Sequence, residues 1–148
     1  MQLNPFTDTY FMKEALKEAR KALALDEVPV GCVIVCENNI VSRTHNYTQK
    51  LNDVTAHAEV LAITAAADYL GSKYLSDCIM YVTLEPCIMC AGAAYWAQFK
   101  QIVFGANDLK RGYSSVSKNI LHPKTKVVRN VLNEECTKLL RDFFKKKR

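Results

Sequence analysis

Alternation of helical and strand-like segments is the feature of this sequence that most restricts its fold. Amphipathic stretches with apolar residues three or four positions apart predict helices, and short apolar runs rich in branched and aromatic residues predict strands. The expected order is a helix over about 7–25, a hairpin of strands at 30–36 and 40–45, a helix over 55–70, a strand at 78–84, a helix over 86–98, strands at 101–104 and 126–131, and a helix from Asn133. This order predicts an α/β fold with a mixed sheet and helices on both faces.

The bulk properties indicate a single domain, residues 1–148, without a linker, an internal repeat or a low-complexity segment. Hydrophobic residues make up 49% of the chain and charged residues 24%, which is ordinary for a globular protein. No apolar run reaches the roughly 18 residues that cross a bilayer, and residues 1–8 lack the layout of a secretory signal. We therefore expect a soluble protein of the cytoplasm with no membrane partner.

The six cysteines point to metal or redox chemistry rather than to disulfides. Cys87 and Cys90 form a Cys-x-x-Cys pair, which in a chain without a secretory signal is typical of a metal site or a redox dithiol. The other four lie in apolar strand-like runs or on an apolar helix face. They are expected to be buried, reduced thiols: Cys32, Cys36, Cys78 and Cys136.

Two short motifs stand at predicted helix starts: Thr55-Ala56-His57-Ala58-Glu59 and Glu85-Pro86-Cys87-Ile88-Met89-Cys90. Cysteines three residues apart in a first helical turn project to one side, and a helix N-terminus favours the thiolate that binds metal. One histidine with two cysteines is a known catalytic zinc set that leaves a fourth position for water. The remaining histidines and cysteines lack a matching spacing. The sequence therefore predicts an open zinc site of His57, Cys87 and Cys90.

Glu59 supplies the acid–base part of the predicted site. It stands only two residues from His57, too close for both to bind one ion from the same helix face. A carboxylate in that place can carry a proton from water to a leaving amine. A lone His-x-Glu would indicate a capping histidine and a surface glutamate, and a lone Cys-x-x-Cys a redox pair. Together the two motifs form the known signature of zinc deaminases.

At these residues the sequence resembles the cytidine deaminase-like superfamily of zinc deaminases, and within it the bacterial tRNA-specific adenosine deaminases. The similarity runs over nearly the whole chain, through residues 27–31, 45–46, 53–59, 81–93, 103–108, 135–136 and 142–144. It implies a three-layer α/β/α fold with a mixed five-stranded sheet, one zinc ion per subunit and a homodimer. It also implies hydrolytic conversion of the wobble adenosine in a tRNA anticodon loop to inosine.

The resemblance further implies that Asn46 meets the target base and that Asp108 lies near its ribose. From the residues alone, Asn46 would be a turn residue after a strand and Asp108 a loop cap. Arg111 lies in a stretch that departs from the family pattern, where it either pairs with RNA or belongs to a packed loop.

A second departure supports an alternative activity. The Trp96-Ala97 step looks like the guanine deaminases of the same superfamily. This departure at Tyr95-Trp96 supports a deaminase of free guanine or cytosine, or of a nucleoside, as the alternative. A zinc-stabilised RNA-binding module without catalysis is a further one. Glu59 argues against that module, because a structural zinc site has no use for a carboxylate beside an open metal position.

The net charge of +5 arises largely from a basic end, residues 145–148. An anticodon loop offers unstacked bases that can enter a pocket, and an enzyme that binds it needs a positive rim for the phosphates. Lys110, Arg111, Lys118 and the 145–148 end supply such a rim if they converge in space. Otherwise the basic end is a solvated tail.

Overall fold

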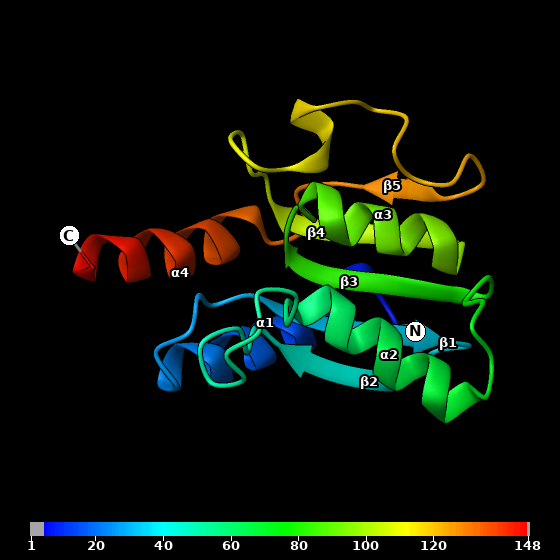
Figure 1. Cartoon of the computed structure of the whole chain (residues 1–148), viewed down its shortest axis with the longest axis horizontal. Helices are drawn as coiled ribbons and strands as arrows, with labels where there is room; N and C mark the ends of the chain where they lie inside the picture. The colour runs from blue at the N-terminus through cyan, green and yellow to red at the C-terminus, as the bar shows by residue number, and fades with distance from the viewer. Residues whose placement is uncertain (1–4, 148) are drawn as a thin grey trace.

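The computed structural model describes residues 5–147 and contains one five-stranded sheet with four α-helices (Figure 1). The elements, in chain order, are α1 (Asp8–Ala24), β1 (Gly31–Cys36), β2 (Asn39–His45), α2 (Ala58–Leu70), β3 (Cys78–Leu84), α3 (Ile88–Ala97), β4 (Gln101–Ala106), the short 3-10 helix η1 (Tyr113–Ser115), β5 (Lys126–Val128) and α4 (Asn133–Lys146). The predicted alternation of helices and strands is confirmed.

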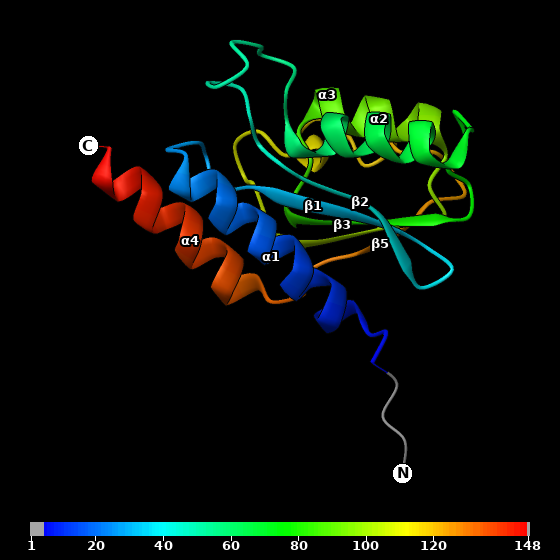
Figure 2. The ribbon, with the colours of Figure 1, turned by 90° about the horizontal axis from the view of Figure 1, so that it is seen from below.

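The sheet is mixed and has the strand order β2-β1-β3-β4-β5. Strand β1 pairs antiparallel with β2 and β3, whereas β3, β4 and β5 run parallel to one another. Figure 2 shows α2 and α3 side by side over one face of the sheet, with α1 and α4 over the other. This arrangement confirms the expected three-layer α/β/α fold, because both faces of the central strands are covered.

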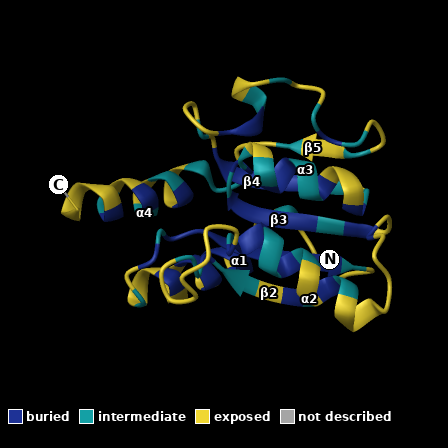
Figure 3. Cartoon of the chain, in the orientation of Figure 1, coloured by how far each residue is buried: buried dark blue, intermediate teal, exposed yellow. Residues whose placement is uncertain are grey.

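Two glycines allow the helices to approach the sheet closely. A Cβ atom on Gly31 would overlap the carbonyl oxygen of Ala15 in α1, and a Cβ on Gly105 would overlap the sulfur of Cys136 in α4. Apolar side chains fill the layers on each side, and Figure 3 shows β3 and β4 buried over most of their length. The sheet is therefore a rigid platform for the two helices that cover its other face.

The two helices that carry the sequence motifs begin later than expected. The structure places the N-cap of α2 at His57 and that of α3 at Cys87, whereas the sequence predicted helices that begin at Thr55 and Pro86. Thr55 is held instead by Asp53, whose Oδ1 accepts hydrogen bonds from the amide and hydroxyl of Thr55 at 2.8 Å. Because the helices begin later than expected, His57 and Cys87 lie at the N-terminal ends of α2 and α3.

Two strand bounds also differ from expectation. Strand β4 extends to Ala106, and β5 ends at Val128 instead of Val131. The early end of β5 follows from the backbone of Asn130 and Leu132, which adopt φ values of 65° and 56° and turn the chain into α4. Within residues 5–147, no helix is long and apolar enough to cross a membrane.

Candidate metal centre

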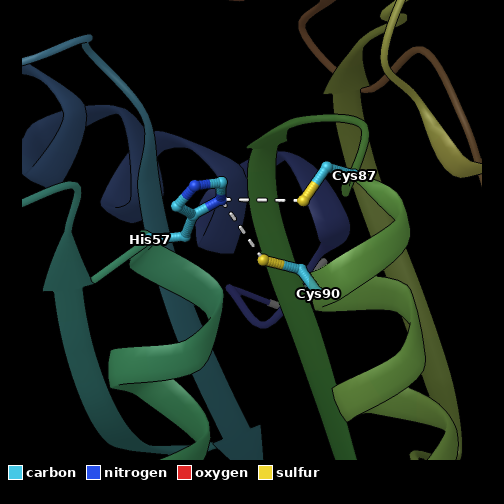
Figure 4. A group of neighbouring side chains, drawn as sticks. All are labelled: His57, Cys87 and Cys90. Carbon is cyan, nitrogen blue, oxygen red and sulfur yellow. Dashed lines mark hydrogen bonds between the residues drawn. The ribbon is translucent and has the colours of Figure 1, made fainter. Parts of the chain in front are cut away.

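His57, Cys87 and Cys90 meet at the adjoining ends of α2 and α3. Nδ1 of His57 lies 3.7 Å from Sγ of Cys87 and 3.5 Å from Sγ of Cys90. The ligand-type atoms of the three residues all lie within 4.8 Å of one another. Figure 4 shows the imidazole ring, at the start of α2, facing the two sulfur atoms at the start of α3. The structure thus brings together the three residues that the sequence selected as metal ligands.

These separations fit a tetrahedral zinc ion. Zinc–sulfur bonds of about 2.3 Å and zinc–nitrogen bonds of about 2.0–2.1 Å give a nitrogen-to-sulfur distance of about 3.6 Å across a tetrahedral angle. The two observed distances lie on either side of that value. One imidazole nitrogen and two thiolates are also ligands that zinc prefers. The residues present therefore fit the metal without a rearrangement of the backbone.

The surroundings of Cys87 favour its thiolate, which is the form that binds a metal ion. A hydrogen bond from Cys90, together with His57, lowers the pKa of Cys87 to about 4. For Cys90 the effect is opposite: the hydrogen bond to Cys87 and the burial of the thiol raise the pKa of Cys90 far above the usual range of a thiol. The pair thus shares one proton, with the thiolate on Cys87, at the N-terminus of α3, where a negative charge is favoured.

Glu59 lies in the first turn of α2 and is only 4% exposed. Burial raises the pKa of its carboxyl to about 7, and the negative charge of Cys87 adds to the effect. The carboxyl also hydrogen-bonds with the Cys90 thiol, which places it beside the three ligand-type atoms. A buried carboxyl with a near-neutral pKa can both take up and release a proton at neutral pH.

Asn46 is buried at the end of β2 and has an unsatisfied side-chain oxygen. Its Nδ2 donates to the carbonyl of Val28 at 3.3 Å, but its buried Oδ1 has no hydrogen-bond partner. The amide of the next residue, Tyr47, donates to the carbonyl of Ala56 at 3.0 Å and so holds this segment against the start of α2. A buried polar atom without a partner is costly and usually indicates a ligand position.

Asp108 and Arg111 lie together in the segment that follows β4. Oδ1 of Asp108 accepts hydrogen bonds from the amides of Lys110 (3.2 Å) and Arg111 (3.0 Å), so this carboxylate caps the loop. These contacts agree with the prediction from residue type that Asp108 caps a loop. The side chain of Arg111 is exposed and does not belong to a packed loop interior.

Two buried carboxylates that the sequence did not single out hold the loops around the centre. Glu27, fully buried, accepts hydrogen bonds from the amides of Gln49 (3.0 Å) and Lys50 (2.7 Å). Glu85, two residues before Cys87, accepts from the amides of Asp108 (3.2 Å) and Ser114 (3.1 Å). Residue type gave no signal for either role, because glutamate is mostly exposed and is buried only when it is paired.

Comparison with known proteins places this geometry in a family. A family model described as the cytidine and deoxycytidylate deaminase zinc-binding region matches residues 6–106. The tRNA-specific adenosine deaminase of Aquifex aeolicus (strain VF5) is 46% identical over 143 residues, which is 94% of this chain and 95% of that protein. The chain belongs to the tRNA-specific adenosine deaminase family. Its cofactor is zinc, which agrees with the geometry of His57, Cys87 and Cys90.

Solved structures give the same family picture. A structure from a study of A-to-I editing by tRNA:A34 deaminases at the wobble position of transfer RNA is 39% identical and matches with a TM-score of 0.83, covering 89% of this chain and 99% of that one. The guanine deaminase of Bacillus subtilis is 38% identical with a TM-score of 0.65, covering 76% of each chain. The fold of the adenosine deaminase family is thus shared over most of the chain, and part of it also by a guanine deaminase.

Proposed function

We propose that this protein converts the wobble adenosine of a tRNA anticodon loop to inosine by hydrolytic deamination, releasing ammonia. The observation that carries the proposal is the meeting of His57, Cys87 and Cys90 with the buried carboxyl of Glu59. Relatives that match nearly the full chain are tRNA-specific adenosine deaminases, which supports adenosine in tRNA as the substrate. The whole chain, residues 1–148, is proposed to act as one domain in the cytoplasm.

His57, Cys87 and Cys90 are the proposed zinc ligands, with one zinc ion per subunit. When bound there, zinc would supply Lewis-acid activation of water near neutral pH. Three protein ligands rather than four are typical of a catalytic site. Within residues 5–147, no fourth histidine, cysteine or carboxylate joins the group of ligand-type atoms.

Glu59 is the proposed proton carrier. Its carboxylate would take a proton from the attacking water, which adds to the adenine carbon that bears the amine. The protonated carboxyl would pass this proton to the ring nitrogen next to that carbon. The second proton of the attacking water would then reach the departing nitrogen through the same carboxyl, and ammonia leaves as the carbon–nitrogen bond breaks and the carbonyl of inosine forms. Burial of this carboxyl, which raises its pKa, helps it to hold the proton between the two halves of this cycle.

Asn46 is the proposed contact for the base. Its Nδ2 is fixed by the carbonyl of Val28, so its partnerless Oδ1 is oriented in advance to accept a hydrogen bond from an N–H group of the purine. Binding would then satisfy a buried acceptor that the protein itself leaves unpaired. The segment of Asn46 packs against the segment that leads to His57, so this contact lies close to the reacting atoms.

The segment after β4 is proposed to meet the nucleotide backbone. Asp108 uses Oδ1 for its own loop, and its second carboxylate oxygen would accept a hydrogen bond from the ribose. The exposed Lys110 and Arg111 follow directly and would pair with phosphates. Lys118 is exposed farther along the same connection to β5.

The basic end of α4 is a proposed second contact with tRNA. Figures 1 and 2 both show α4 projecting beyond the sheet toward the end at which α2 and α3 begin. Lys147 pairs with Asp26 at 2.7 Å and so holds the end of α4 against the turn that follows α1. Lys145 and Lys146 remain exposed and carry the proposed phosphate contacts, while Arg148 lies outside the described residues.

A homodimer is proposed on the basis of the outer side of α3. Ile88, Tyr95 and Trp96 are 52%, 37% and 73% exposed, and helical spacing brings them to one side with Gly92 between them. No atom outside the helix lies within 4 Å of the position of a Cβ on Gly92, which leaves room for the close approach of another helix. Large exposed apolar groups around a small residue are typical of a helix-packing surface.

Deamination of free guanine is the second candidate. It is supported by Tyr95-Trp96 and by the likeness to the Bacillus subtilis guanine deaminase. The deciding assay measures inosine in a tRNA that carries adenosine at the wobble position, with ammonia release from free guanine, cytosine and adenosine in parallel. Inosine in tRNA with inert small molecules supports the proposal, whereas turnover of guanine with untouched tRNA overturns it.

A further inference from the structure

Glu85 is buried and surrounded by hydrogen-bond donors from a single segment, residues 107–115. Its side chain is 2% exposed. Oε1 accepts from the amide of Asp108 at 3.2 Å, and Oε2 accepts from both the amide (3.1 Å) and the hydroxyl of Ser114. The guanidinium of Arg129 adds an ion-pair contact at 3.6 Å from Oε1. Both carboxylate oxygens therefore act only as acceptors toward this segment.

The 107–115 segment is also fitted against the chain between Glu85 and α3. The amide of Tyr113 donates to the carbonyl of Pro86 at 2.9 Å, and Gly112 forms an isolated antiparallel bridge with Cys87. A Cβ atom on Gly112 would overlap the carboxyl carbon of Glu85, so the backbone of the segment rests directly on that side chain. The position of the 107–115 segment thus depends on residues 85–87, the stretch that also contains Cys87.

The segment held in this way presents the proposed nucleotide contacts. The amide of Asp108 is fixed by Glu85, and the carboxylate of Asp108 in turn fixes the amides of Lys110 and Arg111. A chain of hydrogen bonds therefore leads from Glu85 to the backbone of Arg111. On the other side, buried Tyr113 packs edge-on against Phe104, which anchors the apolar end of the segment.

We propose that Glu85 is a positioning residue for the tRNA substrate, which it affects through the 107–115 segment without touching the reacting atoms. The proposal rests on the proposed function, because the contacts it positions are those assigned to the nucleotide. Only an acceptor on both oxygens satisfies the donors of Asp108 and Ser114. An amide in its place would point an N–H group at another N–H group and release part of the segment.

The test compares Glu85→Gln, Ser114→Ala and the control Glu18→Gln in the zinc-loaded full chain. Glu18 is also a buried carboxylate, but it lies in α1, on the opposite face of the sheet from α2 and α3 (Figure 2). Glu85→Gln is expected to raise the KM for tRNA about tenfold with a much smaller change in kcat, and to leave zinc content at one ion per subunit. Ser114→Ala removes only one donor and should raise KM about fivefold. Glu85→Asp, which keeps both acceptor oxygens, should recover part of the loss.

Hydrogen exchange gives a measurement independent of activity. Amide exchange in peptides covering 107–115 should accelerate in Glu85→Gln and not in Glu18→Gln, with peptides from α2 unchanged. If Glu85→Gln folds poorly, Ser114→Ala alone decides the matter. An unchanged KM and unchanged exchange in Ser114→Ala, or loss of zinc with unaltered exchange in Glu85→Gln, would overturn the proposal. A wild-type protein that does not deaminate tRNA would instead overturn the proposed function, and the exchange result would still report on the segment.

Discussion

Sγ of Cys87 lies 3.7 Å from Nδ1 of His57, although 30 residues separate the two in the sequence. The contact exists because each residue is the N-cap of its helix and the two helices begin at the same end of one face of the sheet. Two helix N-termini and one imidazole thus surround the sulfur of Cys87. This surrounding favours a thiolate even before a metal ion binds.

Selective alkylation of Cys87 is expected in zinc-free protein. With a pKa of about 4, this thiol is ionised at pH 6, whereas burial raises the pKa values of Cys78 and Cys136 to about 12. Iodoacetamide should therefore modify Cys87 at a rate that is nearly flat from about pH 6 to 8 and falls as pH approaches 4, because the thiolate is then protonated. Peptide mass spectrometry after timed quenching measures the rate.

Zinc provides the control for this reaction. Stoichiometric zinc should protect Cys87, and Cys87→Ser should remove the fast phase from zinc-free protein. A rate that rises steadily from pH 6 to 9 would contradict the prediction, since that profile belongs to an ordinary thiol.

The clustering of the three proposed metal ligands and the elements that carry them could be predicted from the sequence, since both depend on local spacing. His57, Cys87 and Cys90 stand in motifs whose positions at helix starts are visible in the pattern of residues. The role of Glu85 could not be predicted. Its partners, Asp108 and Ser114, are 23 and 29 residues away, and only the parallel pairing of β3 with β4 brings them to it.

The first residue of α2 could not be predicted from the sequence for a similar reason. Thr55 is a good cap by residue type, and the competing hydrogen bonds from Thr55 to Asp53 depend on a turn that propensities do not fix. The missing partner of Asn46 Oδ1 is likewise a three-dimensional fact. A sequence can nominate an asparagine after a strand, but only the packing around it reveals that one of its atoms is buried without a partner.

Glu59→Gln is expected to lower kcat at least about 100-fold while zinc stays bound, because the amide keeps the shape of the side chain but cannot accept the proton. Glu59→Ala should be equally inactive. The measurement combines inosine formation in tRNA with metal analysis of the purified variant. Cys87→Ala and Cys90→Ala serve as the contrasting pair, since they should lose the metal as well as the activity. Near-normal turnover in Glu59→Gln would refute the assignment of the proton carrier.

Asn46→Ala is expected to reduce kcat/KM for tRNA by about 5- to 150-fold, because a base N–H group would lose its acceptor in a buried site. Its stability should change by less than about 1 kcal/mol, since Oδ1 has no partner to lose. The carbonyl of Val28, which accepts from Nδ2, still accepts from the amide of Val30 at 2.8 Å. Steady-state kinetics and denaturant unfolding measure the two effects. A large loss of stability with unaltered kcat/KM would assign Asn46 a structural role instead.

Trp96→Glu is expected to convert the proposed dimer into a monomer, because a carboxylate would be buried on the apolar side of α3 when two copies meet. Sedimentation equilibrium measures the change in mass. Tyr10→Glu introduces the same charge at an aromatic residue of α1 that is 42% exposed, and it should leave the mass unchanged. A wild-type protein that is monomeric at all concentrations would contradict the proposal.

Substitution of both Lys145 and Lys146 by glutamine is expected to weaken tRNA binding and flatten its salt dependence. Each lost phosphate contact reduces the slope of log K against log salt by about 0.7–0.9. Lys147 is left intact so that its ion pair with Asp26 continues to hold the end of α4. The control replaces Lys73 and Lys100, exposed lysines near the opposite end of the sheet, and makes the same change in net charge. Equal slopes for both double variants and wild type would show that the end of α4 is a solvated tail. Deletion of residues 145–148 should then also have no effect on tRNA affinity.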